Sequence, residues 1–299
     1  MGVRPLTYPE RVQKPWGFLR FWAGLVRVRR IAILIDGGFF IKRLPRVVEH
    51  RFRNTPDAVA ETARVLCKRH VQRLIGERER DDNSRWLDHV YRLFCYDARP
   101  YDGISHHPTL NRRIEFARTD QARFREALFH ALRQKRKFAL RLGQVTKESD
   151  WQISARLTKR LLKTRNWLHL LDAALQGEDV AREAASEHQR KELERLVADW
   201  RGLDETDVAL GLRQKGVDMR IGLDITSITL KKQADTIILV TGDSDFVPAA
   251  KLARREGVEF ILDPMRQSIG DDLFEHIDGL VSVLGQGPLR DQAEEEANG

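Results

Sequence analysis

Aspartates recur in this chain directly after apolar runs, where several carboxylates could share a metal ion. Six residues stand at such places: Asp36, Asp97, Asp218, Asp224, Asp243 and Asp263. Converging carboxylates repel one another and raise one another's pKa, and a bound divalent cation removes that cost. Oxygen ligands without His or Cys suit Mg²⁺ or Mn²⁺, which can activate a water for attack on a phosphodiester. These residue types therefore predict a metal-dependent hydrolase.

Each aspartate also has a structural alternative. A single Asp after a strand often forms a turn or caps a helix. Ser244 or Asp245 would cap a helix that begins near Phe246, and Asp263 forms a common turn pair with Pro264. An acidic pocket would also fit a receiver-like or haloacid-dehalogenase-like protein, but the matched Lys and Thr motifs of those classes are not found in the sequence.

The elements around these acids predict an α/β fold, a doubly wound and mainly parallel sheet. Apolar runs predict strands at residues 31–35, 90–96, 217–223, 236–241 and 258–262, with an edge strand at 281–284. Helical patterns lie between them at about 55–77, 225–232, 246–256 and 272–277. Strands that alternate with helices form parallel sheets, and ligands bind beyond the carboxyl ends of such strands.

The middle of the chain follows another pattern. Helices are predicted at 122–136, 157–175 and 180–200, with a short strand at 138–142. We interpret residues 102–205 as a basic helical insertion within one domain, residues 31–285, because strand-helix units flank it. Residues 1–30 form a basic and aromatic extension, and we expect the acidic tail, residues 286–299, to be disordered.

Composition and charge predict a globular protein that binds a polyanion. The chain has 299 residues, of which 41% are hydrophobic and 32% charged, so a wholly disordered chain is excluded. Its formal charge is +8, and residues 111–165 alone hold 16 Lys and Arg against five Asp and Glu. A solvated helix face is the plain alternative. Beside a phosphodiesterase site we instead expect a continuous phosphate-binding face that opens onto the acids. Its predicted nucleic-acid contacts are Arg133, Lys135, Arg136, Lys137, Arg141, Lys159, Arg160 and Lys163.

The cysteines and the N-terminal segment bear on the compartment. Cys67 and Cys95 lie in apolar patterns and suit small buried side chains in a reducing, cytoplasmic compartment. The apolar run at residues 16–26 is interrupted by Arg20, lacks a following cleavage site and is too short to span a bilayer. We expect no membrane span and an extension packed on the domain. A membrane-surface or nucleic-acid contact through this run is the alternative.

Three segments together resemble the NYN domain family, which belongs to the PIN-like superfamily of metal-dependent nucleases. They are Ile33-Leu34-Ile35-Asp36-Gly37-Gly38-Phe39, the Lys-Gly-Val-Asp run at 215–218 with its continuation to Asp224, and Leu239-Val240-Thr241-Gly242-Asp243-Ser244-Asp245-Phe246. The last segment is the most specific. The resemblance covers residues 31 to about 101 and 207 to about 284, and leaves the middle region and the extension unexplained.

The resemblance implies catalytic and metal-binding roles for particular acids. Asp36 corresponds to the first-strand ligand, and Asp243 with Asp245 to the pair after the later strand. Asp224 corresponds to the remaining acid of the catalytic quartet. Asp218 corresponds to the acid of the Lys-Gly-Val-Asp run and joins the metal set. The chain has Gly38 and Phe39 where many relatives carry an asparagine. Thr241 and Ser244 could donate hydrogen bonds to the acids.

The resulting hypothesis is that the protein is a Mg²⁺- or Mn²⁺-dependent nuclease, and specifically an endoribonuclease. Hydrolysis would leave a 5′-phosphate and a 3′-hydroxyl if the chemistry of the superfamily holds. The alternative is a catalytically silent RNA-binding or regulatory module on the same fold. Nothing in the sequence reports on the 2′-hydroxyl, so DNA remains open as a substrate. Whether the chain forms a homo-oligomer is also open.

Overall fold

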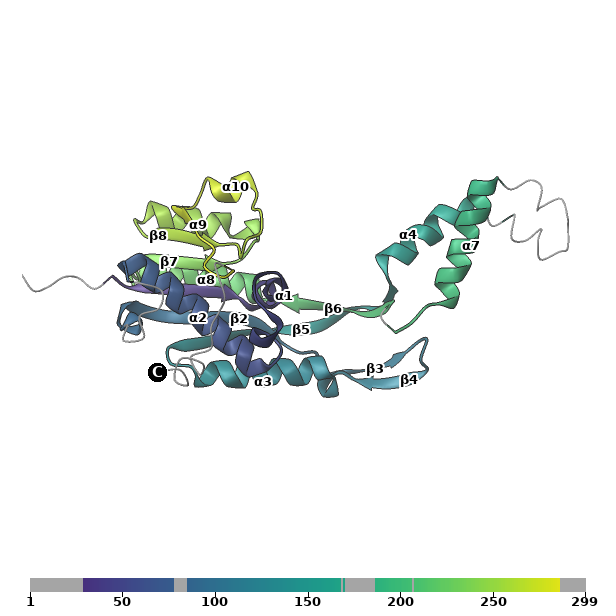
Figure 1. Ribbon diagram of the computed structural model, residues 1–299, viewed down its shortest axis with the longest axis horizontal. Helices are drawn as coiled ribbons and strands as arrows, with labels where there is room; N and C mark the ends of the chain where they lie inside the picture. Colours follow the sequence, from purple (N-terminus) through teal and green to yellow (C-terminus); the bar gives the residue numbers. More distant parts are fainter. Residues whose placement is uncertain (1–28, 78–84, 168, 170–185, 206, 286–299) are drawn as a thin grey trace, which may run out of the picture.

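The structure, a computed structural model, describes residues 29–77, 85–167, 169, 186–205 and 207–285. A body built on one large sheet carries helices on both faces, and a two-stranded arm leads from it to a pair of helices (Figure 1). The N-terminal extension up to residue 28, the acidic tail and most of the expected helical stretch at 168–185 lie outside the described residues.

Within these ranges the main sheet has seven strands in the order β6-β5-β2-β1-β7-β8-β9. Their bounds are β1 Ile31–Asp36, β2 Val90–Arg99, β5 Phe138–Ile153, β6 Val208–Lys215, β7 Thr236–Val240, β8 Glu259–Asp263 and β9 Gly279–Leu280. Neighbouring strands are parallel, except that β6 runs antiparallel to β5. The mainly parallel α/β sheet expected from the sequence is confirmed.

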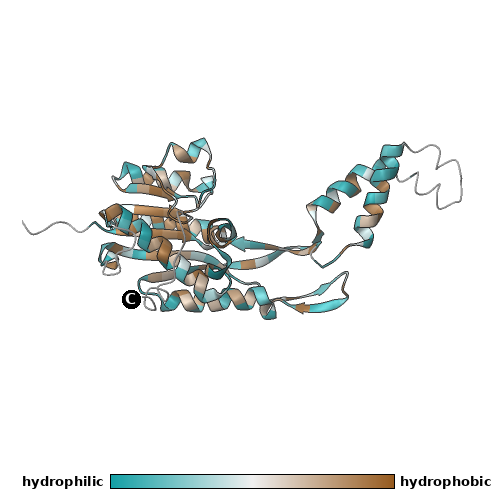
Figure 2. Cartoon of the chain, viewed as in Figure 1, coloured by the Kyte–Doolittle hydropathy of each residue, from teal (hydrophilic) through white to brown (hydrophobic). Residues whose placement is uncertain are grey.

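Helices cover both faces of this sheet. On one face lie α1 (Gly37–Val47), α2 (Pro56–Ile75) and α3 (Asp120–Gln134), packed on Ile31, Ile33 and Ile35. On the other lie α8 (Val217–Leu230) and α9 (Val247–Arg255), packed on Ala32 and Leu34. Because β1 is buried on both faces, its apolar run has no polar alternation. Figure 2 shows that the strands of the main sheet are hydrophobic and that the arm is more hydrophilic.

Local signals set the ends of several helices. Thr55 caps α2 by accepting a hydrogen bond from the amide of Ala58, Pro56 is its first residue, and Gly76 ends it with φ 74°. The shorter helical elements are η1 His50–Phe52, η2 Trp86–His89, η3 Phe116–Arg118, η4 Arg165–Trp167, η5 Ser244–Phe246 and α10 Asp271–Phe274. Among the described helices none is both long and apolar enough to cross a membrane.

The arm grows out of the sheet itself. The first part of β5 pairs with β2, from Phe138 opposite Leu93 to Gln144 opposite Arg99. Its remainder pairs only with β6, as far as Ile153 opposite Val208. Since β5 runs parallel to β2, the arm leaves the sheet at the carboxyl edge. It leads to α4 (Ala155–Thr164) and α7 (Glu187–Arg201), beside the hairpin of β3 (Ile104–His107) and β4 (Arg112–Glu115) (Figure 1).

The expected strand at residues 217–223 is wrong, because these residues begin helix α8. Residues 217–223 alternate between apolar side chains and polar or small ones, as a strand would. The buried residues Val217, Ile221, Ile225 and Ile228, however, continue at helical spacing across the whole helix. Gly216, with φ 77°, turns the chain from β6 into α8. Strand β6, which precedes that turn, was not expected from the sequence.

Part of the expected insertion lies in the main body. Helix α3 and the first half of β5, residues 120–144, complete one side of the sheet. The expected strand at 138–142 is present and extends to Ile153. The helical character expected for 180–200 appears as α7, and residues 104–115, at the start of the expected insertion, form the β3–β4 hairpin.

Candidate metal centre at the carboxyl edge

The chain order creates a crevice at the centre of the carboxyl edge. From β1 the chain moves outward to β2 and β5, and later returns to the other side of β1 for β7 and β8. Connections from β1 and β7 therefore leave in opposite directions. In open α/β sheets such a switch point is where ligands bind. Asp36 ends β1, and Asp243 lies just beyond the end of β7.

Asp36 is fixed by hydrogen bonds from both sides of this crevice. Its Oδ1 accepts from the amide of Phe39 at 3.0 Å and so caps α1, and its Oδ2 accepts from the Thr241 hydroxyl at 3.4 Å. The donor role expected for Thr241 is confirmed. Burial, followed by repulsion from Asp218 and Asp97, raises the pKa of Asp36 to about 6. Its carboxylate is thus held at an energetic cost.

The glycine after Asp36 allows the close packing of this corner. A Cβ atom on Gly37 would lie 2.6 Å from the backbone carbonyl oxygen of Tyr96 on β2. No side chain fits there without a shift of the backbone. The Asp-Gly-Gly run noted in the sequence therefore serves the geometry: it turns β1 into α1 against the neighbouring strand, with the carboxylate of Asp36 at the edge.

Asp243 and Asp245 lie on the facing loop after β7, and both are exposed. The Asp243 carboxylate accepts from the amide of Asp245 at 3.0 Å, which caps η5. The amide of Asp243 donates to the Thr241 hydroxyl at 3.3 Å. Thr241 thereby links this loop to Asp36. The cap expected from Ser244 or Asp245 for the helix near Phe246 is wrong: Asp243 caps η5, and α9 begins without a side-chain cap.

Asp218 comes from a third direction, the first turn of α8. Partial burial and repulsion from Asp243 and Asp245 raise the pKa of its carboxyl group. Asp218 in turn raises the pKa of Asp36. Asp218 thus repels Asp36 on one side and Asp243 and Asp245 on the other. Within the described ranges none of these four acids forms an ion pair.

Asp224, expected as the fourth catalytic acid, has other contacts. Its Oδ2 accepts from the Tyr96 hydroxyl at 2.8 Å and from Nε of Arg141 at 3.2 Å. It lies six positions after Asp218, which turns it about 120° around α8. Arg141 also lies 5.6 Å from the centre of the Phe94 ring. The structure therefore ties Asp224 to β2 and β5 by a hydrogen-bonded cluster of its own.

The remaining strand-end acids have side-chain partners on the helices. Asp97 forms an ion pair with Arg125 of α3 and accepts from the amide of Ala98. Asp263 lies 2.8 Å from Nε2 of His70, and both side chains are buried. Asp97 lies near the carboxyl end of β2 and Asp263 is the last residue of β8, on either side of the central crevice, and both hold helices to the sheet.

The donor set at the crevice suits a hard cation, although the ligands are few. Carboxylate repulsion that raises the pKa of Asp36 and Asp218 is the strain that a divalent cation relieves. In the described part of the chain, no group of three or more His, Cys, Asp or Glu side chains is placed to hold a metal ion alone. Mg²⁺ in particular is often held by one or two carboxylates, with waters and substrate phosphates as its other ligands.

One group of expected nucleic-acid contacts lies away from the acids. Arg133, Lys135, Arg136 and Lys137 precede Phe138, which pairs with Leu93 near the start of β2. They therefore lie at the amino edge of the sheet. Lys135 forms an ion pair with Glu61 at 2.7 Å, and Lys137 donates to the carbonyl of Leu87 at 2.6 Å. The expected positive face that opens from this cluster onto the acids is wrong, since a strand's length separates them.

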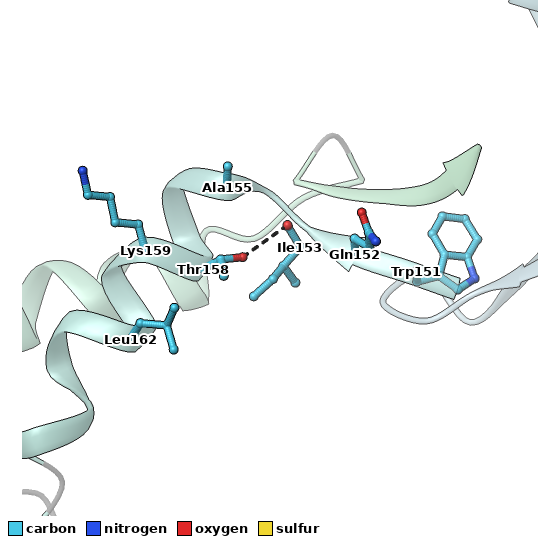
Figure 3. A pocket seen from close by; sticks show the side chains of 7 residues that line it. All are labelled: Trp151, Gln152, Ile153, Ala155, Thr158, Lys159 and Leu162. Carbon is cyan, nitrogen blue, oxygen red and sulfur yellow. Dashed lines mark hydrogen bonds between the residues drawn. The ribbon is translucent and has the colours of Figure 1, made fainter. Parts of the chain in front are cut away.

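The other expected contacts lie on the acids' side. Arg141 is near the carboxyl edge, and three lie on α4 at the end of the arm: Lys159, Arg160 and Lys163. Acids of α7 pair with two of these, Asp199 with Arg160 and Glu192 with Lys163. Lys159 instead lines a shallow groove with Trp151 and Leu162, where the Thr158 hydroxyl donates to the Ile153 carbonyl (Figure 3).

Sequence analysis missed a pocket beside the acids and the strand that helps to form it. Asp97, Tyr101, Arg125 and Gln214 are among its lining residues. Gln214 lies on β6, and its Oε1 would be 3.7 Å from a Cβ on Gly38. The alternation of large apolar and small residues in Val208 to Leu212 was the available signal, but the neighbouring Val217 run was assigned as the strand.

The fold is consistent with a PIN-like α/β protein. The model of the NYN domain family, a PIN-like nuclease-family domain, matches residues 172–280, which hold α8, β7 and the loop of Asp243. The match confirms the resemblance inferred from the sequence for the later segments, and residues 31–101, with Asp36, lie outside it. NYN domains are generally nuclease-like, and the domain suggests nucleic-acid binding.

Two further comparisons were made. Curated proteins gave no match. A crystal structure of a protein of unknown function from Vibrio parahaemolyticus is similar at 13% identity, covers 86% of this chain and 94% of that chain, and has a TM-score of 0.38.

Proposed function

We propose that this protein is a divalent-metal-dependent nuclease, with RNA as its substrate. The observation that carries the proposal is the set of four acids without ion pairs at the switch point of the sheet: Asp36, Asp218, Asp243 and Asp245. Asp97 and Asp263, elsewhere on this edge, pair with Arg125 and His70. Carboxyl groups without such partners and with raised pKa values, as at Asp36 and Asp218, are typical of a functional site.

Mg²⁺ or Mn²⁺ fits this donor set, with Asp36 and the acids that face it as ligands. When bound, the ion supplies charge neutralisation at the phosphate and activation of the attacking water. The chain's own residues hold the geometry. The amide of Phe39 and the hydroxyl of Thr241 fix both oxygens of Asp36, and η5 fixes Asp243 against Asp245. Because these bonds exist before substrate binds, little reorganisation is needed.

The role of Asp224 is a positioning one in this proposal. Its bonds to Tyr96 and Arg141 hold α8 against β2 and β5, and so set where Asp218 lies at the start of the helix. A substrate phosphate that attracted Arg141 would free Asp224 to turn toward the other acids. The size of the loss in an Asp224 variant separates a ligand from a positioning residue.

The test is cleavage of labelled RNA and of DNA of the same sequence, with Mg²⁺, Mn²⁺ or EDTA. We expect RNA cleavage that needs the metal, and its loss in Asp36→Asn, where the amide can still cap α1. Asp88→Asn is the matched control, because Asp88 is exposed and lies just before β2, at the amino edge of the sheet. Equal cleavage by wild type and Asp36→Asn would point to a contaminating nuclease and contradict the proposal.

One observation favours a second candidate, a silent RNA-binding module. Among the described residues no three acids already form a metal-holding group. A silent module predicts RNA binding that neither Mn²⁺ nor Asp36→Asn changes, and no cleavage at any metal concentration. Mn²⁺-dependent cleavage decides for the enzyme.

A further inference from the structure

Helix α8 presents an apolar stripe to solvent. Met219, Leu223 and Leu230 are 72%, 61% and 58% exposed. Their spacing of four and seven residues places all three within about 40° around the helix axis. The opposite side of α8 is buried against the sheet through Val217 and Ile221. This helix is therefore apolar on two sides, which a helix covered on only one side does not need.

The chain enters the described structure at one end of this stripe. The amide of Arg30 donates to Asp235 at 2.8 Å, and its guanidinium donates to the backbone carbonyl of Lys232 at 2.7 Å. Lys232 lies two residues after Leu230, the last residue of α8. The preceding part of the chain thus joins the body next to the C-terminal end of the stripe.

That preceding part holds the most apolar stretch outside the described residues. Residues 16–26 read Trp-Gly-Phe-Leu-Arg-Phe-Trp-Ala-Gly-Leu-Val and contain one charged residue, Arg20. The stripe from Met219 to Leu230 is about 16 Å long. A segment of this length covers about 15 Å even when fully helical, and more when extended. Only residues 27 and 28 separate this segment from Arg29, so it ends close to the C-terminal end of α8.

We propose that the N-terminal segment, residues 16–26, packs on the exposed α8 stripe of its own chain. Leu230 would receive the end near Val26, and Met219 the end near Trp16. The short connection gives the segment a high effective concentration at this face, which a second copy of the chain lacks. The inference concerns an interface within the chain and does not depend on the proposed nuclease activity.

Cross-linking in the full chain tests the interface directly. The two native cysteines, Cys67 and Cys95, are buried and stay unreactive toward a maleimide in the folded protein. We expect Ala23→Cys with Leu223→Cys to cross-link within one chain through a short bismaleimide. Ala23→Cys with Arg133→Cys is the matched control, because Arg133 is exposed at the amino edge on the other face of the sheet.

Three results would overturn the proposal: no cross-link to residue 223, equal cross-linking to residues 223 and 133, or a cross-link that joins two chains. The last would assign the stripe to a second copy. Trypsin cleavage after Arg20 or Arg27 gives an independent measurement. Leu223→Lys should speed it about tenfold by freeing the segment. Leu162→Lys, an equally exposed leucine at the end of the arm, should leave it unchanged.

Discussion

The centre and the flanks of the sheet's carboxyl edge carry the same residue type in different electrostatic settings. At the flanks, Asp97 is paired with Arg125 and Asp263 with His70. At the centre, Asp36 meets an amide, a hydroxyl and another carboxylate. The flanking acids fasten helices to the sheet, whereas the central acids are held apart from cations. Their partners, and not their place at the end of a strand, separate the structural acids from those that we propose to be functional.

The largest effect on activity is expected when a central acid is removed. Asp243→Asn should lower metal-dependent RNA cleavage by roughly 10²–10³-fold, because a catalytic metal contributes several kcal/mol to the transition state. Its melting temperature in EDTA should hold or rise, since carboxylate repulsion falls. Single-turnover cleavage and thermal unfolding measure both. A similar loss in Asp88→Asn, at the amino edge of the sheet, would show that the effect is not local.

The reverse pattern is expected at the flank. Asp263→Ala leaves His70 and the amide of Met265 buried without their acceptor. Removing one partner of a buried pair costs about 3–5 kcal/mol of unfolding free energy. Cleavage per folded molecule at low temperature should match the wild type. Denaturant unfolding and active-site titration check this, and a stable but inactive variant would move Asp263 into the functional set.

The pH dependence of the unfolding free energy tests whether the charge of Asp36, at the centre of the edge, destabilises the fold. The pKa of Asp36 is about 6 in the folded protein, above its ordinary value of 3.8, so the folded state binds the proton more tightly. Its charge therefore destabilises the fold above pH 6, and that cost disappears as the pH falls through about 6 toward 3.8. In EDTA, Asp36→Asn should be more stable than wild type at pH 7.5, by about 3 kcal/mol. The gain should shrink on acidification. A gain that does not depend on pH would contradict the shift.

The smallest effect is expected at the cluster of Asp224. Tyr96→Phe removes one hydrogen bond to its carboxylate and should cost about 1 kcal/mol of stability. Cleavage should change by less than about threefold, because that bond only positions α8. Asp224→Asn should lower cleavage far less than Asp243→Asn. Equal losses in the two Asn variants would instead make Asp224 a ligand.

The central strands and their acids could be predicted because their signals are local. A run such as Ile31 to Ile35 has no polar alternation, and an acid at its end must lie at the edge of a parallel sheet. Resemblance to a family added the correspondence of Asp36, Asp243 and Asp245. These inferences needed no knowledge of distant partners.

What sequence could not supply was the partner of each charged side chain. Lys135 belongs to a basic cluster in the sequence, yet Glu61, far away in the chain, pairs with it. Likewise Arg141 and Tyr96 take up Asp224. The strand and helix of residues 208–230 were misassigned because Val217 to Leu223 fits both periodicities over so short a length.

The central place of β1 also governs how the protein can be made. Asp36 and Thr241, which meet across the crevice, are 205 positions apart in the chain. At about 5–20 residues per second, synthesis of that stretch takes roughly 10–40 s. During this time one side of β1 waits for β7 with its backbone groups unpaired, an edge open to aggregation. A nascent chain of this protein therefore depends on protection of that edge until its last quarter emerges from the ribosome.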